Sequence, residues 1–120
     1  MKNEEKDLLP RTKTFARRII HLYCSLSKTY TVSQVLGKQV LRSGTSVGAN
    51  YREANRARSK AEFISKLGDC LKETDESLYW LELFLEENIV PEKKLSALVT
   101  EANELVAIFI TILKKARGHE

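Results

Sequence analysis

The sequence predicts an all-α protein, an antiparallel up-down-up-down four-helix bundle that forms a single domain over residues 1–120. Apolar residues recur at steps of three and four through four long segments. The connections between these segments are short, as in bundles with antiparallel neighbours, and no stretch alternates apolar and polar residues as a strand does. We expect helices near residues 12–28, 32–57, 60–87 and 92–117, with residues 1–9 and 118–120 frayed.

The first expected helix has one apolar stripe and an opposite basic face. Its stripe residues follow one another at steps of four, three and four: Phe15, Ile19, Leu22 and Leu26. At about 100° per residue, the opposite side of the helix carries Lys13, Arg17, His21, Cys24 and Lys28. We expect this side to be solvated or to bind a partner.

The second expected helix contains two glycines, Gly44 and Gly48, in a run of small polar residues. Each interior glycine costs a helix roughly 1 kcal/mol relative to alanine, so a Ser/Thr/Gly loop is the alternative interpretation. The apolar spacing nevertheless continues through the run, and no Pro, Asn-Gly or Asp-Gly marks a turn. We therefore expect a continuous helix, opened by a capping box at Thr31 and Gln34, whose glycines admit a neighbouring helix.

The third and fourth expected helices carry heptad-like stripes. A capping box at Ser59 and Glu62 opens the third helix, and Asn88 is suited to the left-handed cap that ends it before Pro91. The stripe of the third helix is Ile64, Leu67, Leu71, Thr74, Leu78, Leu81 and Leu85. The stripe of the fourth helix is Leu95, Leu98, Ala102, Leu105, Phe109, Ile112 and Ala116.

The last two helices carry more apolar side chains than one core can bury. On the third helix these are Trp80 and Leu83, which lie near an outward face rich in glutamates. On the fourth helix they are Val99, Val106 and Ile110, at the edge of the stripe. We therefore expect a homo-oligomer, with these five residues at the subunit interface.

Composition indicates a soluble cytoplasmic protein. Cys24 and Cys70 form no CxxC motif and are expected to be reduced thiols. The longest strongly apolar run, residues 105–113, is about half the length of a membrane span, and the N-terminus carries no apolar signal region. We expect no membrane partner.

No arrangement of residues predicts catalysis, a metal site or a cofactor. His21 and His119 have no cysteine or carboxylate at metal-ligand spacing, and no Glu-x-x-His motif occurs. The spacing of Gly44 and Gly48 lacks the Gly-Lys-Ser/Thr of a nucleotide-binding loop. We therefore expect a non-enzymatic protein.

Charge is strongly polarised along the chain. Residues 1–60 hold 13 Lys/Arg and 4 Asp/Glu, whereas residues 61–120 hold 7 and 12. Four cations fall within about 80° of the second helix, with Thr45 and Ala49 between them, and two more extend the surface. The candidate nucleic-acid-binding residues are therefore Lys38, Arg42, Arg52, Arg56, Arg58 and Arg17.

A structural interpretation of the same arginines stays open. They can pair with glutamates of the third helix, in the same or a neighbouring subunit, which would make the protein an interaction scaffold without nucleic-acid contact. Glu53 is the only acid within residues 8–60. We expect it to bond Asn50 or to pair with Arg52, Arg56 or an arginine of a neighbouring helix.

Two runs carry a resemblance to a known family. The segment from Leu41 to Ala54, LRSGTSVGANYREA, resembles the central motif of a bacterial four-helix-bundle family, the 23S rRNA intervening-sequence proteins, and residues 71–83 are also similar. The resemblance implies a homopentameric ring associated with RNA. A related bundle is the accessory variability protein of diversity-generating retroelements, whose basic surface contacts nucleic acid and a reverse transcriptase. The resemblance therefore implies an RNA, DNA or protein partner. The residues of this chain that match the family motif include Arg42, Arg52 and Glu53.

Overall fold

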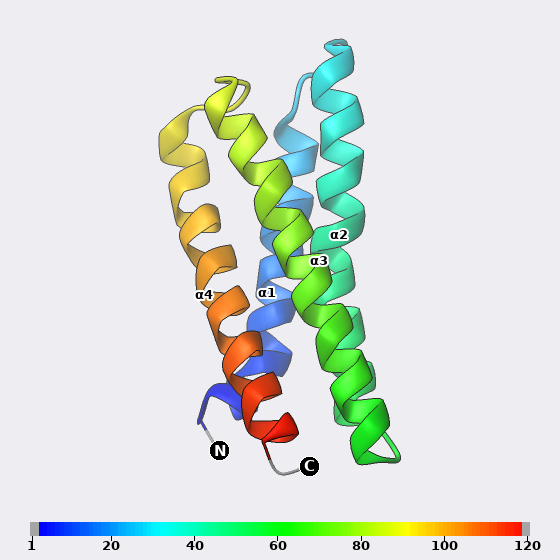
Figure 1. Cartoon of the computed structure of the whole chain (residues 1–120). Coiled ribbons are helices and arrows are strands. Elements are labelled where there is room, and N and C mark those ends of the chain that lie inside the picture. The colour runs from blue at the N-terminus through cyan, green and yellow to red at the C-terminus, as the bar shows by residue number, and fades with distance from the viewer. Residues whose placement is uncertain (1–2, 119–120) are drawn as a thin grey trace.

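The computed structural model describes residues 3–118, and the side chains of residues 7–118. Four helices fill an elongated volume of 49 × 21 × 20 Å: α1 Asn3–Ser25, α2 Thr31–Asn55, α3 Lys60–Glu86 and α4 Glu92–Arg117. Each helix runs opposite to the one before it in the chain (Figure 1). No strand occurs within residues 3–118. The predicted all-α four-helix fold is confirmed.

Helix α1 begins earlier and ends earlier than the sequence predicted. Residues 3–9 are helical, so the expectation that they fray was wrong, while residues 1, 2, 119 and 120 lie outside the described part. Leu8 is completely buried and anchors this segment, although Pro10 lies inside the helix and cannot donate a backbone hydrogen bond. The helix ends at Ser25 because the Ser27 hydroxyl accepts from the backbone N–H groups of Thr29 and Tyr30 and forms a turn.

Neither of the two predicted capping boxes forms in full. The cap of α2 is Tyr30, not Thr31, and no side chain makes a capping hydrogen bond there. The side chain of Gln34 bonds two residues before α2 instead. Its amide donates to the Ser27 carbonyl (2.7 Å), and its oxygen lies 3.1 Å from the Tyr23 hydroxyl. At α3, the Ser59 hydroxyl accepts from the Glu62 backbone N–H as predicted, but the Glu62 carboxylate accepts from the Arg58 backbone N–H and not from that of Ser59.

Helix α2 is continuous through both glycines, as predicted. A Cβ at Gly44 would lie 2.8 Å from Ile19 Cγ1 of α1. A Cβ at Gly48 would lie 3.2 Å from the Thr12 hydroxyl oxygen and 3.4 Å from the Thr12 carbonyl carbon. The missing side chains therefore let α1 and α2 pack closely together.

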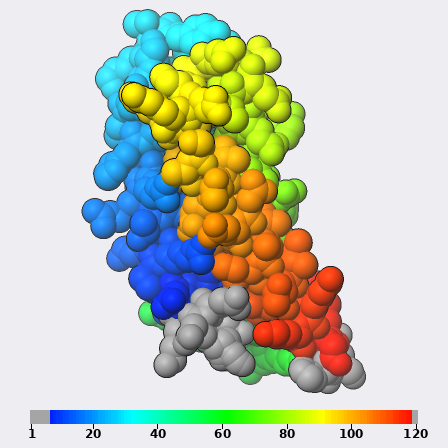
Figure 2. Space-filling view, turned by 90° about the vertical axis from the view of Figure 1, so that its left-hand side faces the viewer, coloured from blue at the N-terminus to red at the C-terminus, as the bar shows by residue number. Residues whose placement is uncertain are grey.

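The core contains apolar side chains from all four helices, with the fully buried rings of Phe15, Phe84 and Phe109 among the largest. Helices α1 and α4 contact each other much less than the other neighbouring pairs do. Figure 2 shows the face on which these two helices lie side by side. Arg11 of α1 joins them, with Nε 2.7 Å from Glu101 and Nη2 2.6 Å from Glu104.

Helix α4 has the bounds that the sequence predicted, and Asn88 before it has a positive φ of 56°. By length and composition alone, α4 could cross a membrane, since an 18-residue window has a mean hydropathy of 1.6. The core helix of a bundle meets the same criterion, and α4 presents a regular buried stripe from Leu95 to Leu113. Because only 33% of the window is buried, part of its apolar surface stays accessible.

Candidate nucleic-acid interface

Helices α1 and α2 border a groove of about 810 Å³ on the outside of the bundle, which we call the α1–α2 groove. Small side chains line it where the two helices approach each other: Ala16, Thr45, Gly48 and Ala49. Three cations also line it, Lys13 from α1 and Arg52 and Arg56 from α2. The remaining lining residues are Leu9, Pro10, Thr12, Glu53 and Asn55. The groove thus combines low steric bulk with positive charge.

Five of the six predicted nucleic-acid-binding residues have exposed side chains and no ion-pair partner within residues 7–118. They are Lys38, Arg52 and Arg56 on α2, Arg58 in the connection to α3, and Arg17 on α1. Their charge is therefore not neutralised by any described carboxylate. Of this set, the groove brings together Arg52 and Arg56, and it adds Lys13, which the predicted set did not include.

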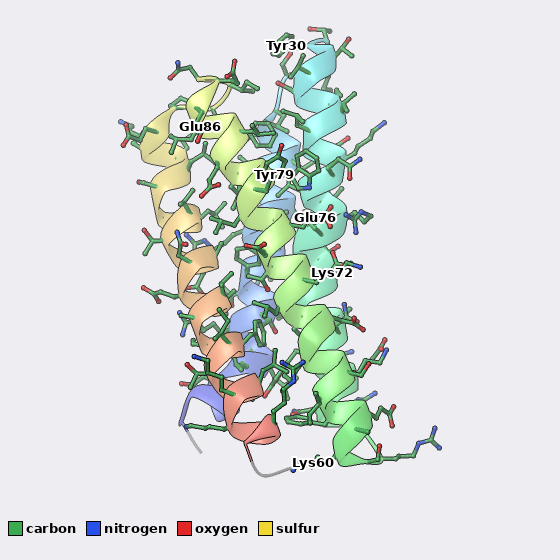
Figure 3. All side chains as sticks on the ribbon, viewed as in Figure 1. Tyr30, Lys60, Lys72, Glu76, Tyr79 and Glu86 are labelled. Carbon is green, nitrogen blue, oxygen red and sulfur yellow. The ribbon has the colours of Figure 1, made fainter. Side chains whose placement is uncertain are left out.

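Arg42 differs from the other predicted residues because it is paired. Its Nη1 lies 3.3 Å from Glu73 Oε1, and its Nη2 bonds Glu76, which also accepts from the Trp80 indole N–H at 3.1 Å. Figure 3 shows Glu76 on the α3 side of this contact. The hydrogen bond with Glu76 raises the pKa of Arg42 and lowers the pKa of Glu76. For Arg42, the geometry agrees with the alternative interpretation, in which the arginine pairs with glutamates of α3, and its contact with nucleic acid stays a prediction.

Glu53 pairs with none of the partners named from the sequence. Its Oε1 lies 2.6 Å from the Nζ of Lys66 on α3, a contact that raises the pKa of Lys66. Asn50 instead donates to the Ser46 carbonyl at 3.0 Å. Sequence reasoning missed Lys66, because the register that sets Lys66 opposite Glu53 depends on how two helices pack.

The predicted subunit-interface residues differ in exposure. Trp80 and Val99 are half-buried against the core, Leu83 and Val106 are also half-buried, and Ile110 is exposed. The structure adds exposed apolar side chains that the prediction omitted, including Val32 and Val35 on α2 and Tyr79 on α3. The ring of Tyr79, labelled in Figure 3, meets that of Trp80 edge-on at 5.1 Å. The spacing of Val32 and Val35, off the core stripe of α2, is the signal that could have revealed them.

The remaining reactive side chains form no catalytic arrangement in the part of the chain that the structure describes. No group of three or more His, Cys, Asp and Glu side chains is placed there to hold a metal ion. Burial raises the pKa of the Cys70 thiol to about 12, so it stays protonated at neutral pH, whereas Cys24 is exposed.

These features define an all-α four-helix-bundle protein with a cationic groove on one face. The chain belongs to the 23S rRNA-intervening sequence protein family, whose model matches residues 4–111. A similar solved structure is that of a protein of unknown function from the S23 ribosomal protein family of Bacteroides thetaiotaomicron. The two chains are 38% identical, with a TM-score of 0.84 over 92% of this chain and 97% of the other. No curated protein matches this chain.

Proposed function

We propose that this protein is a non-enzymatic bundle that binds nucleic acid, RNA above all, through the cationic surface of α1 and α2. The observation that carries the proposal is the set of five exposed cations without an ion-pair partner among the described residues: Arg17, Lys38, Arg52, Arg56 and Arg58. Membership of a family described by an rRNA intervening sequence supports RNA as the first nucleic acid to test.

Binding of this kind works through phosphates. Each arginine or lysine that neutralises a phosphate releases a condensed counterion, so affinity falls steeply as salt increases. Within residues 7–118, no aromatic side chain on which a base could stack lines the α1–α2 groove. Contacts to phosphates position a protein on a nucleic acid without reading the base sequence. Binding is therefore expected to be nearly independent of that sequence.

Self-association is the second part of the proposal. The predicted interface set, Trp80, Leu83, Val99, Val106 and Ile110, lies on α3 and α4, away from the cationic groove. The accessible apolar surface of α4 supports a contact between copies, and the family resemblance supports a pentamer. A ring would repeat the cationic surface, so weak contacts would add through avidity.

One observation favours a second candidate, a protein-interaction scaffold without nucleic-acid contact. Arg42, at the edge of the cationic surface, is already paired with Glu73 and Glu76. If neighbouring copies supply further carboxylates, the other arginines can be neutralised in the same way. A protein partner, such as the reverse transcriptase implied by the resemblance, would then be the better candidate.

Titration of the purified protein with a structured RNA and with a duplex DNA, each at low and high salt, separates the two candidates. The test variant is Arg52→Gln/Arg56→Gln, and the matched control is Lys114→Gln/Lys115→Gln, which removes the same charge from exposed positions on α4. We expect the test variant to weaken binding by at least about tenfold, more than the control does, with its assembly intact. The scaffold candidate predicts no binding by wild type even at low salt.

A further inference from the structure

We propose that Lys66 keeps the α1–α2 groove cationic by holding the carboxylate of Glu53, and that the groove takes one phosphodiester strand of a nucleic acid. The inference rests on the proposed function and deepens it. It assigns a ligand class to the groove and a positioning role to a residue that does not line it.

Among the residues whose side chains the structure describes, Glu53 is the only acid that lines the groove, beside the cations Lys13, Arg52 and Arg56. Glu53 and Arg56 are three residues apart on one helix, a spacing at which opposite charges readily pair. Such a pair would neutralise one of the two groove arginines. Instead, Glu53 Oε1 lies 2.6 Å from Lys66 Nζ, and Arg56 has no ion-pair partner within residues 7–118.

Lys66 therefore compensates the negative charge of Glu53, the acid that lines the groove within residues 7–118. While Glu53 is paired with Lys66, the charges of Lys13, Arg52 and Arg56 remain available to attract an anion. Without Lys66, the carboxylate is free to bond Arg56 or to repel an incoming phosphate. Lys66 itself belongs to α3 and is absent from the groove lining, so it acts through Glu53 and not by direct contact.

The shape of the groove favours a single strand. Arg52 and Arg56 stand one helical turn apart, about 6 Å along the axis, which is similar to the spacing of neighbouring phosphates on one strand. Gly48 and Ala49 leave no bulky side chain beside them, and Thr45 adds only a small hydroxyl. Because no aromatic residue is among the described lining residues, the recognised part of the nucleic acid is its backbone and not its bases.

The test is the affinity of the full-length protein for a fluorescent single-stranded oligothymidylate at low salt, measured for wild type, Glu53→Gln, Lys66→Gln and the double variant. Lys72→Gln, which removes an exposed lysine of α3, is the control for loss of one positive charge. We expect Lys66→Gln to weaken binding about fivefold, Lys72→Gln by less than about twofold, and Glu53→Gln to tighten binding. In the Glu53→Gln background, Lys66→Gln should weaken the affinity for the oligothymidylate no more than Lys72→Gln does.

Two results would overturn the inference while leaving nucleic-acid binding in place. One is that Lys66→Gln and Lys72→Gln weaken the affinity equally. The other is that Lys66→Gln weakens the affinity as much in the Glu53→Gln background as it does in wild type. If wild type binds no oligothymidylate but binds duplex or structured RNA, the single-strand assignment is wrong. If wild type binds neither oligothymidylate, nor duplex DNA, nor structured RNA at low salt, the proposed function fails as well. Circular dichroism of each variant shows that a lost affinity does not come from a lost fold.

Discussion

The hydroxyl oxygen of Ser77 on α3 lies 2.8 Å from that of Ser43 on α2, and both side chains are fully buried. Ser77 also lies 2.8 Å from the Glu73 carbonyl, so the two hydroxyls form one short chain of hydrogen bonds between the helices. Small polar residues therefore bring α2 and α3 together, and the nearby residues Arg42 and Glu73 form an ion pair between the same two helices.

Replacing either serine by alanine should destabilise the bundle. We expect Ser43→Ala and Ser77→Ala each to lower the free energy of unfolding by about 1 kcal/mol, because the remaining buried hydroxyl loses a partner. The double variant should cost less than the sum of the two, with a coupling of at least about 0.5 kcal/mol. Urea denaturation of the four proteins measures this coupling, and strict additivity would contradict the hydrogen-bonded pair.

Alanine substitution should have opposite effects at two glycines. A Cβ at Gly44 would meet Ile19 Cγ1 at 2.8 Å, whereas at Gly68 it would meet nothing within 4 Å. We expect Gly44→Ala to lower the free energy of unfolding by up to about 2 kcal/mol, since overpacking outweighs the gain in helix propensity. Gly68→Ala should raise it by about 0.5–1 kcal/mol. Thermal unfolding compares the two, and equal shifts would disprove the close approach of α1 and α2.

The pair of Arg42 and Glu76 should make stability depend on acid pH. The pKa of Glu76 is lowered below 4.5 in the folded state, chiefly by its hydrogen bond with Arg42. Its contribution is therefore present above pH 4.5 and is lost as the pH falls through the folded-state pKa. We expect wild type to lose more stability than Glu76→Gln between about pH 6 and pH 3, with a small difference because solvent screens the pair. Parallel slopes in urea titrations at each pH would contradict this.

Self-association should depend on the outer face of α4. We expect Ile110→Glu to convert the assembly to single chains without loss of helicity, because the residue is 38% exposed and is not among those packed against the core. Thr111→Glu, at the neighbouring exposed position, is the control and should remain assembled. Analytical ultracentrifugation measures both, and a wild type that sediments as one 13.7 kDa species would refute the assembly proposal.

The sequence was sufficient to predict the helices and the close helix packing at two glycines, since both follow from the spacing of residues along the chain. Stripes at steps of three and four require helices, and Gly44 and Gly48 within such a stripe are explained by close packing. The start of α1 was mispredicted because the complete burial of Leu8 is a tertiary effect, which the local pattern of residues 1–9 does not reveal.

The candidate site was only partly predictable. Exposure of Arg52 and Arg56 follows from their position on α2, but the partners of Arg42 and Glu53 depend on the axial register of α2 against α3. Periodicity within one helix carries no information on that register. Likewise, Lys13 and Ala16 could join the groove only once the distance between α1 and α2 was known.

The salt dependence of RNA binding tests the central claim most directly, because its slope reports how many phosphates the protein neutralises. The slope of log K against log salt is measured for wild type, Arg52→Gln/Arg56→Gln and the control Lys114→Gln/Lys115→Gln. For RNA bound as a single strand, the account predicts that the groove variant lowers the slope by about 1.4, or 0.7 for each lost phosphate contact, while the control retains it. A wild-type affinity independent of salt, or equal slopes for the two variants, would contradict a cationic groove that binds nucleic acid.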